Sequence, residues 1–411
     1  MNETIAPQTA HNRKDVKNEP VSPQATHNRT DVLNVLRVTA TLFVFFLHGR
    51  SYIDGINETK PLFGILTSLP AWAGVWILFF LSGYLMQKGF DAGRYVVFGQ
   101  PGPHRKRYFA FVGKRLAKIA PAYYIYLLLF FVLQESTYPF AHPLAMLRVL
   151  TFTFNGNGGI SGMGHLWYIS LAVWMYALAP FFAWLIEKTR RLMRGVFPVM
   201  LLTLVIAAGL GARFLMRSLG LGWYDWVYTF LPMNLDLFFG GMLAAAVTRD
   251  RIGCAGKRLR MLLKVSSAAL FVVLVSINCY VYYKEQYLWY QYVMPTLYLT
   301  ICAFLCFSFD GQGFVYEKPT WPNIRKNPLR LIDAFSPLTY AFYIFHIMAF
   351  RFWDVNLHRF SFYQNLPTDG KWVVFFALSF ALTLGIAWCY TKMIAVFRRK
   401  KFPAATAAVP R

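Results

Sequence analysis

An arginine and a histidine share one apolar stretch near the start of the chain. Arg37 and His48 both lie in residues 31–50 and are eleven positions apart. If the stretch is helical, this spacing brings both side chains to one face, about 16 Å apart along the axis. Imidazole suits proton transfer near neutral pH, and a guanidinium suits binding or stabilising negative charge. The pair therefore predicts a functional site, in which His48 suits the role of base or nucleophile and Arg37 suits binding or stabilising negative charge.

The composition indicates that this stretch crosses a membrane. The chain has 411 residues, of which 57% are hydrophobic and only 15% are charged. A soluble domain carries about a quarter charged residues. Several apolar runs are long enough to cross the ~30 Å hydrocarbon core of a bilayer. The sequence predicts an all-α polytopic membrane protein, in which ionisable side chains inside a span mark functional sites.

The distribution of positive charge predicts the topology. The ten spans that we expect lie near residues 32–50, 72–88, 117–134, 166–187, 196–215, 227–247, 263–283, 287–308, 334–352 and 372–395. Of the 42 Lys and Arg residues, 33 fall on the side that holds both termini and 9 on the other side. The positive-inside rule then predicts that both termini are cytoplasmic. The net charge of +24 therefore reflects the orientation of the chain in the membrane, and it does not indicate a nucleic-acid partner.

The chain divides into one membrane domain and two tails. Residues 1–30 are polar and are expected to form a disordered cytoplasmic tail, and residues 397–411 form a basic cytoplasmic tail. Residues 31–396 form the ten-helix domain. The five cysteines are scattered, with no His or acidic residue placed to complete a metal site, so we expect no metal and no disulfide framework.

A dense basic segment precedes the third span. It runs over residues 88–118 and contains Lys114, Arg115 and Lys118 at the point where the chain enters the membrane. On a helix Arg115 and Lys118 share a face, because they are three positions apart. Two interpretations stay open for this segment: charge that sets the topology, or a seat for a phosphate-rich cytosolic ligand.

Two more segments combine small residues with groups that could line a site. Ser82 and Gly83 end the second span, where they serve either helix packing or the shape of a site. His165 and Trp167 follow the glycine-rich run of residues 155–164, whose backbone could approach a ligand closely. The alternative for these two residues is an ordinary position at the membrane interface.

Two polar residues stand inside later spans. His346 lies in the middle of the ninth span, where it either hydrogen-bonds a neighbouring helix or lines the site. Asp236 lies in the sixth span, and an acid at this depth needs a partner. Arg37, Arg213 and His48 are the candidate partners. We predict that His346 and Asp236, together with Ser82, His165 and Trp167, line the substrate site.

These landmarks, in this order, resemble the membrane acyltransferase-3 family over roughly residues 31–395. That family has an Arg-x10-His signature in its first span, an SGF-like turn in the second and a basic entry to the third that ends in I-x-P-x-Y. An HLW-type entry to a later span and a YxxYLxH-type motif follow. The matching residues are Arg37 and His48; Leu81, Ser82, Gly83 and Tyr84; Lys114, Arg115, Lys118, Ile119, Pro121 and Tyr123; His165, Leu166 and Trp167; and Tyr340, Tyr343 and His346.

The resemblance implies an enzyme of the bacterial cytoplasmic (inner) membrane. Members of the family are similar in moving an acyl group, commonly acetyl and sometimes succinyl, from cytoplasmic acyl-CoA to a carbohydrate hydroxyl. It implies that Arg37 and His48 are catalytic and that Lys114, Arg115 and Lys118 bind the CoA donor. The expected partners are thus acyl-CoA, a carbohydrate or polysaccharide acceptor and the lipid bilayer, with no nucleic acid and no metal.

One departure from the family pattern bears on the acceptor. Many members carry a Glu shortly after the Trp of the HLW-type entry, whereas here no acid occurs between Trp167 and Glu187. A subgroup that modifies periplasmic glucans or other polysaccharides also lacks it, so the resemblance favours a polysaccharide acceptor. A non-enzymatic exporter or flippase of polysaccharide or lipid-linked sugar is the alternative function, and it would not bind CoA. A structural scaffold would give no reason for Arg37 and His48 on one face.

Overall fold

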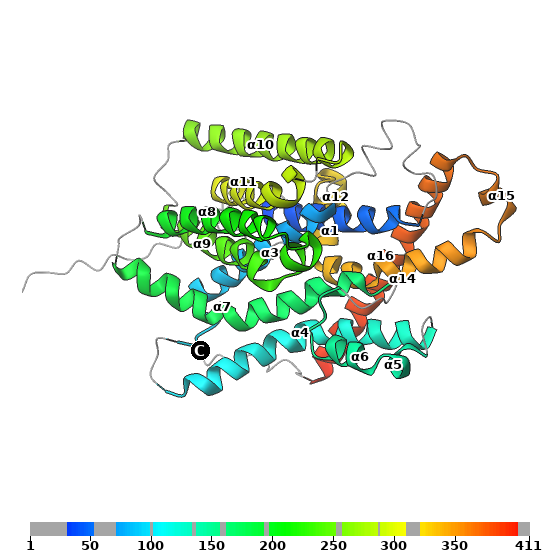
Figure 1. Cartoon of the computed structure of the whole chain (residues 1–411), viewed down its shortest axis with the longest axis horizontal. Coiled ribbons are helices and arrows are strands. Elements are labelled where there is room, and N and C mark those ends of the chain that lie inside the picture. The colour runs from blue at the N-terminus through cyan, green and yellow to red at the C-terminus, as the bar shows by residue number, and fades with distance from the viewer. Residues whose placement is uncertain are drawn as a thin grey trace, which may run out of the picture.

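The protein is built from helices (Figure 1). The structure, a computed structural model, describes residues 31–52, 71–98, 102–133, 137–156, 162–192, 197–251, 257–286, 288–309 and 321–401, and this part of the chain contains no strand. The predicted tail over residues 1–30, most of the tail over 397–411 and much of the glycine-rich run lie outside these residues.

Ten longer helices correspond to the ten expected spans. They are α1 (Val32–Arg50), α3 (Ala71–Asp91), α4 (His104–Leu133), α7 (Trp167–Leu192), α8 (Phe197–Ser218), α9 (Leu235–Arg251), α10 (Lys257–Tyr283), α11 (Met294–Phe309), α14 (Thr339–Leu357) and α16 (Thr368–Lys401). The short α-helices are α5 (Tyr138–Ala141), α6 (Pro143–Leu150), α12 (Trp321–Lys326), α13 (Arg330–Phe335) and α15 (Ser361–Gln364). The 3-10 and π turns are η2 (Gly164–Leu166), η3 (Tyr224–Tyr228), η4 (Leu231–Asn234), η5 (Trp289–Val293) and η6 (Ser336–Leu338). This element order confirms the predicted all-α fold.

Nine helices in the described part of the chain are long and apolar enough to cross a membrane. The predicted second span, α3, has 21 residues but is not among the nine. It contains Gly74, Ser82, Gln87 and Lys88, which lower its hydropathy, and it packs against α1 and α9. A helix enclosed by other helices needs no lipid-compatible surface all round. The tenth span and the sidedness of the termini stay predictions.

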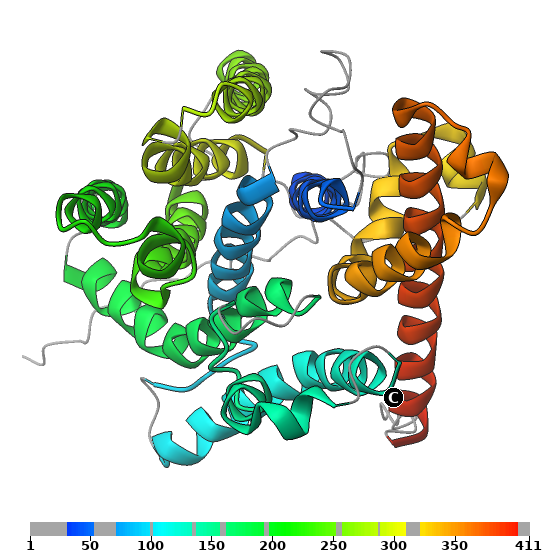
Figure 2. The same cartoon turned by 45° about the vertical axis from the view of Figure 1, so that its right-hand side comes forward.

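Helix α1 lies near the middle of the bundle. Figure 2 shows it almost end-on, with α3 on one side and the segment α13–α14 on the other, and α1 contacts all three. Asp31 begins the helix, because its side chain accepts a hydrogen bond from the Leu33 N–H at 2.9 Å. Leu36 and Ala40 are fully buried on its packed face. The central position explains how α1 can present two polar side chains to different neighbours.

Glycines bring α3 and α9 into close contact. A Cβ added at Gly83 would overlap the carbonyl oxygen of Phe238, and one at Gly241 would overlap that of Phe80. Both glycines therefore allow backbone to meet backbone, as small residues do between membrane helices. This supports the packing role for Gly83, while Ser82 beside it faces a cavity.

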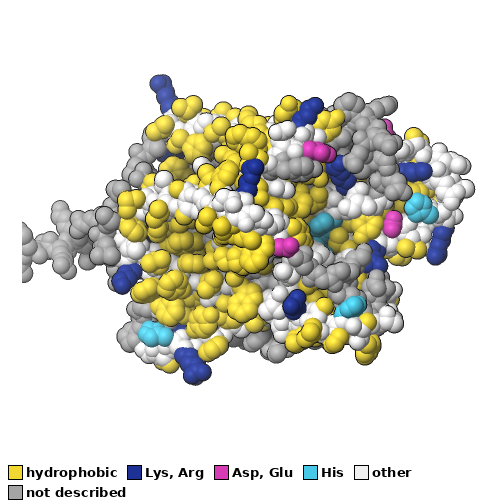
Figure 3. All heavy atoms as spheres, viewed as in Figure 1, with side chains coloured by type: hydrophobic (Ala, Val, Ile, Leu, Met, Phe, Trp, Pro, Cys, Tyr) yellow, Lys and Arg dark blue, Asp and Glu magenta, His cyan; other side chains and the backbone are white. Residues whose placement is uncertain are grey.

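The outer helices carry the lipid-facing surface. On α8 and α10 large apolar side chains such as Leu204 and Val272 are exposed. Figure 3 shows hydrophobic side chains over a broad area of the face in view, across α7 and α8, with Lys and Arg mainly around its margin. Exposed apolar surface of this extent fits hydrocarbon rather than water. The chain is a multi-pass membrane protein.

Candidate active site

A cavity of about 690 Å³ opens between α1, α3, α4, α7, α14 and α16. Four basic side chains line it: Arg37, Arg94, Arg115 and Lys118. None of the described residues along its wall is an Asp or a Glu. Arg94 and Lys118 are exposed, whereas Arg37 and Arg115 are partly buried. An acid-free wall with four cations suits an anionic ligand that enters from the exposed basic side.

Arg37 is held in the cavity wall by neutral groups. Its Nη1 donates to Ser336 Oγ at 2.9 Å and to Asn34 Oδ1 at 3.4 Å. Ser336 Oγ in turn donates to Asn34 Oδ1 at 2.8 Å, and Asn34 Nδ2 donates to Asp333 Oδ1 at 2.8 Å. Within the described residues Arg37 makes no ion pair, so its charge remains available to a ligand.

The basic entry to the third span is helical, because α4 begins at His104. Arg115 and Lys118 both line the cavity, as their shared face predicts, whereas Lys114 is exposed and does not. The guanidinium of Arg115 lies over the ring of Tyr95, 4.2 Å from its centroid. Stacking of this kind fixes the plane of the guanidinium and leaves its edge free to bind phosphate.

A cluster of three histidines lies further along α1, and we call it the histidine cluster. It joins His48 of α1, His165 of η2 and His346 of α14. The Nδ1 of His48 lies 2.8 Å from the Nε2 of His346. The ring centroid of His165 lies 5.1 Å from that of His346 and 6.3 Å from that of His48. Three residues that the sequence singled out separately thus form one group, although none of them lines the cavity.

Backbone carbonyls of α14 fix two of these rings. His346 Nδ1 lies 2.6 Å from the carbonyl oxygen of Tyr343, and His165 Nε2 lies 3.1 Å from that of Ile344. His165 and His346 are 2% and 1% exposed, while His48 is partly exposed. His48 is therefore the member of the cluster that a substrate can reach most easily.

Tyr343 connects the cavity with the histidine cluster. Its side chain lines the cavity, and its hydroxyl donates to the carbonyl oxygen of His165 at 2.7 Å. Tyr340, one turn earlier, also lines the cavity and donates to the carbonyl oxygen of Ile119 at 2.7 Å. The two tyrosines of α14 therefore tie together the segments that hold His165 and the basic entry, which gives their spacing a physical reason.

Trp167 is a packing residue at the start of α7. Trp167 is 4% exposed and packs on Phe79 and Tyr228, with ring centroids 6.0 Å and 4.5 Å away. It supports the start of α7 next to His165 and does not line the cavity. Ser82 does line the cavity.

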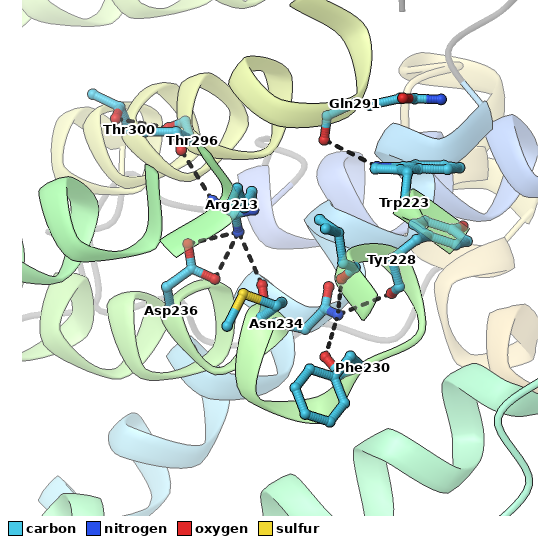
Figure 4. Close-up of polar contacts among 11 residues, drawn as sticks. Arg213, Trp223, Tyr228, Phe230, Asn234, Asp236, Gln291, Thr296 and Thr300 are labelled. Atoms are coloured by element: carbon cyan, nitrogen blue, oxygen red, sulfur yellow. Dashed lines mark hydrogen bonds and ion pairs between the residues drawn. The ribbon is translucent and has the colours of Figure 1, made fainter. Parts of the chain in front are cut away.

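Asp236 is paired with Arg213, one of the three candidate partners. Nη2 of Arg213 lies 2.8 Å and 2.7 Å from the two carboxylate oxygens, and Nη1 donates to Thr296 Oγ1 at 3.1 Å (Figure 4). A Cβ at Gly209 would overlap this carboxylate, so the glycine makes room for it. Asp236 is committed to Arg213 between α8 and α9, and the structure gives it no place in the cavity wall.

Several residues of the cavity were not singled out from the sequence. They are Arg94, Tyr95, Tyr168, Tyr176 and Ser336. Arg94 belongs to the basic segment that the sequence did mark. The tyrosines and Ser336 carry no local signal, because their role depends on which helices pack together.

The family comparison completes this description. The model of the acyltransferase-3 family, described as an acyltransferase domain, matches residues 31–392. The chain belongs to this family. No curated protein and no solved structure matches the chain. Membership in the acyltransferase-3 family identifies the protein as a membrane O-acyltransferase, and the matched range contains the cavity, the histidine cluster and the motifs that carry the resemblance.

Proposed function

We propose that this acyltransferase moves an acyl group from cytoplasmic acyl-CoA to a hydroxyl of a carbohydrate or polysaccharide at the other side of a bacterial cytoplasmic membrane. Acetyl is the expected group, and succinyl is the second candidate. The single observation that carries the proposal is the basic, acid-free cavity, one lining residue of which, Tyr343, contacts His165 and His346 of the histidine cluster.

The cations of the cavity support a phosphate-rich donor. Arg94 and Lys118 are exposed where a cytosolic ligand would enter, and Arg115 is held flat by Tyr95 just inside. Charge-assisted hydrogen bonds to phosphate are shorter and stronger than neutral ones. The CoA nucleotide would occupy this entrance, and its narrow pantetheine arm would run along α1 toward Tyr343.

Distance along α1 assigns different roles to Arg37 and His48. Their separation of eleven positions corresponds to about 16 Å of helix rise. A donor that stabilises an oxyanion must lie within about 3 Å of it. Arg37 is therefore too far from His48 to polarise the same carbonyl, and it anchors the CoA donor instead.

His48 carries the proton chemistry. Its imidazole removes the proton of the acceptor hydroxyl while the acceptor oxygen forms a bond to the acyl carbonyl carbon. The carbon–sulfur bond then breaks, and the CoA thiolate takes the proton from the imidazolium. Overall the products are an acyl ester and free CoA. A path through an acyl-His48 intermediate gives the same products, and trapping of acylated protein without an acceptor distinguishes it.

Purified protein in lipid nanodiscs tests the proposal. It is incubated with radiolabelled acetyl-CoA or succinyl-CoA and the glycans of the source cells. We expect label to appear in glycan esters that mild base releases, and mass spectrometry of surface glycans from cells without the protein to lack the same ester. Glycans that stay fully acylated without the protein, or a purified protein that binds no CoA, would favour the exporter.

A further inference from the structure

The hydrogen bonds of the histidine cluster run in one direction. His346 uses both ring nitrogens, since Nδ1 lies 2.6 Å from the carbonyl oxygen of Tyr343 and Nε2 lies 2.8 Å from Nδ1 of His48. A carbonyl oxygen only accepts, so Nδ1 of His346 must carry a hydrogen. In a neutral imidazole the other nitrogen is then a bare acceptor.

The next bond follows from this assignment. Because Nε2 of His346 accepts, Nδ1 of His48 must donate, and Nε2 of His48 keeps its lone pair. The groups that face the two rings are His165 from η2, Tyr343 and Phe350 from α14 and Phe45 from α1, and among the described residues no Asp or Glu contacts them. Two neutral imidazoles therefore account for both hydrogen bonds. A charged imidazolium would be costly here, because it would be buried without a counter-charge.

We propose that His346 is a positioning residue that holds His48 in the tautomer protonated at Nδ1, so that Nε2 is the atom that reacts. This rests on the proposed function, since it names the reacting atom of that same site. A carboxylate commonly plays this orienting role toward a histidine base. Here a second imidazole fills it, and the Tyr343 carbonyl fixes that imidazole in turn.

The surrounding contacts hold the pair in this arrangement. The rings of His48 and His346 are nearly parallel, with an interplanar angle of 16° and centroids 5.0 Å apart. Phe350 and Tyr343 pack at the edges of His346, with centroids 5.7 Å and 5.8 Å away. His346 is 1% exposed, so it cannot itself meet a bulky acceptor. It acts through His48.

Two substitutions of matched size separate the possible roles of His346. In His346→Gln the amide oxygen can stand near the position of Nε2 and accept from His48. In His346→Leu no acceptor remains. If His346 positions His48, kcat falls by at least about 10²-fold in His346→Leu but stays within about 10-fold of wild type in His346→Gln. The donor KM should stay unchanged in both variants, because neither His346 nor His48 lines the donor cavity.

The tautomer itself can be measured without turnover. Solid-state NMR of ¹⁵N-histidine-labelled protein in bilayers, assigned with the His48→Gln and His346→Gln variants, should show His48 protonated at Nδ1. It should also show a nitrogen–nitrogen coupling across the hydrogen bond to His346. His48→Gln must remove this coupling.

Three results would overturn the inference. They are His48 protonated at Nε2 in the wild type, equal kcat for His346→Leu and His346→Gln, and a His346→Gln protein as inactive as His48→Gln. The second result would make His346 a packing residue, and the third would make it the base. A wild-type protein that moves no acyl group would instead overturn the proposed function, while the NMR spectrum would still decide the tautomer.

Discussion

Two arginines inside the bundle differ in what neutralises them. Arg213 of α8 is 1% exposed and binds both carboxylate oxygens of Asp236. Arg37 of α1 is partly buried, donates only to the neutral side chains of Ser336 and Asn34, and lines the basic cavity. Arg213 thus contacts its counter-charge directly, whereas no carboxylate of the described residues lies within ion-pair distance of Arg37.

The comparison shows how the role of a charge inside a membrane protein can be determined. Both arginines are costly in hydrocarbon, and by this criterion both read as functional. The partner separates them, since a buried bidentate ion pair ties two helices together. We propose that Arg37, whose guanidinium lines the cavity, is a binding group. The variants below test either the buried ion pair or the basic cavity.

Loss of the buried pair should have the largest effect. Arg213→Ala leaves the Asp236 carboxylate buried without a partner, which costs about 3–5 kcal/mol. We expect little folded protein and a sharply lower unfolding temperature in detergent. The control is Arg217→Ala one turn later, because Arg217 is exposed over the ring of Tyr292. Equal stability of the two variants would remove the scaffold role of Arg213.

Loss of Arg37 should affect donor binding and leave the fold intact. Charged hydrogen bonds contribute about 1.5–3 kcal/mol, so Arg37→Ala should raise the acyl-CoA KM about 10- to 100-fold. Arg37→Lys should restore only part of the affinity, because an ammonium does not reproduce the planar fork. The unfolding temperature should stay near that of the wild type. Wild-type donor affinity in Arg37→Ala would contradict the anchor role.

The pair Arg115 and Lys118 should contribute less per residue than Arg37, because Lys118 is exposed to solvent. The double variant Arg115→Ala, Lys118→Ala should weaken CoA binding about 10-fold, and the wild-type affinity should fall as salt rises. Lys114→Ala is the matched control, since Lys114 has the same charge on the same helix but does not line the cavity. Isothermal titration calorimetry with CoA measures the affinity of the wild type, the double variant and the Lys114→Ala control. Equal losses of CoA affinity in the control and in the double variant would mean that Arg115 and Lys118 act only through their general positive charge.

Ser82 should have the smallest effect. Its hydroxyl lines the cavity and lies 3.5 Å from the Tyr176 hydroxyl, a distance at the limit of a hydrogen bond. We expect Ser82→Ala to change the donor KM by about 2-fold and kcat by no more, since a neutral hydrogen bond contributes about 1 kcal/mol or less. A loss above 10-fold in steady-state kinetics would place Ser82 among the reacting groups.

Much of the fold follows from the sequence because hydrocarbon imposes a simple rule. Long apolar runs must be helical, so the expected spans correspond to the helices that the structure contains. The exception is instructive, since α3 has enough residues but lower hydropathy and lies against α1 and α9. Gln87 and Lys88 near the end of α3 lower its mean hydropathy, so polar residues at a helix end weaken the apolar signal.

The site followed from the sequence only in part. Arg37, Arg115 and Lys118, which the sequence singled out separately, line one cavity, and His48, His165 and His346 form a cluster. Local spacing places residues on a helix face, but it does not say which helices meet. The sequence therefore left the partner of Asp236 open among three residues, and it gave no sign that Ser336 holds Arg37. Both facts depend on contacts between distant segments.

We propose that two residues of α1 have separate roles: Arg37 binds the donor, and His48 carries out the transfer. The most direct test measures kcat and the CoA dissociation constant of purified His48→Gln protein in nanodiscs. Gln keeps the size and part of the hydrogen bonding but cannot exchange a proton near pH 7. The account predicts that kcat falls by about 10²-fold or more, while CoA affinity and the unfolding temperature stay unchanged. A His48→Gln protein that transfers acyl groups at close to the wild-type rate would contradict it.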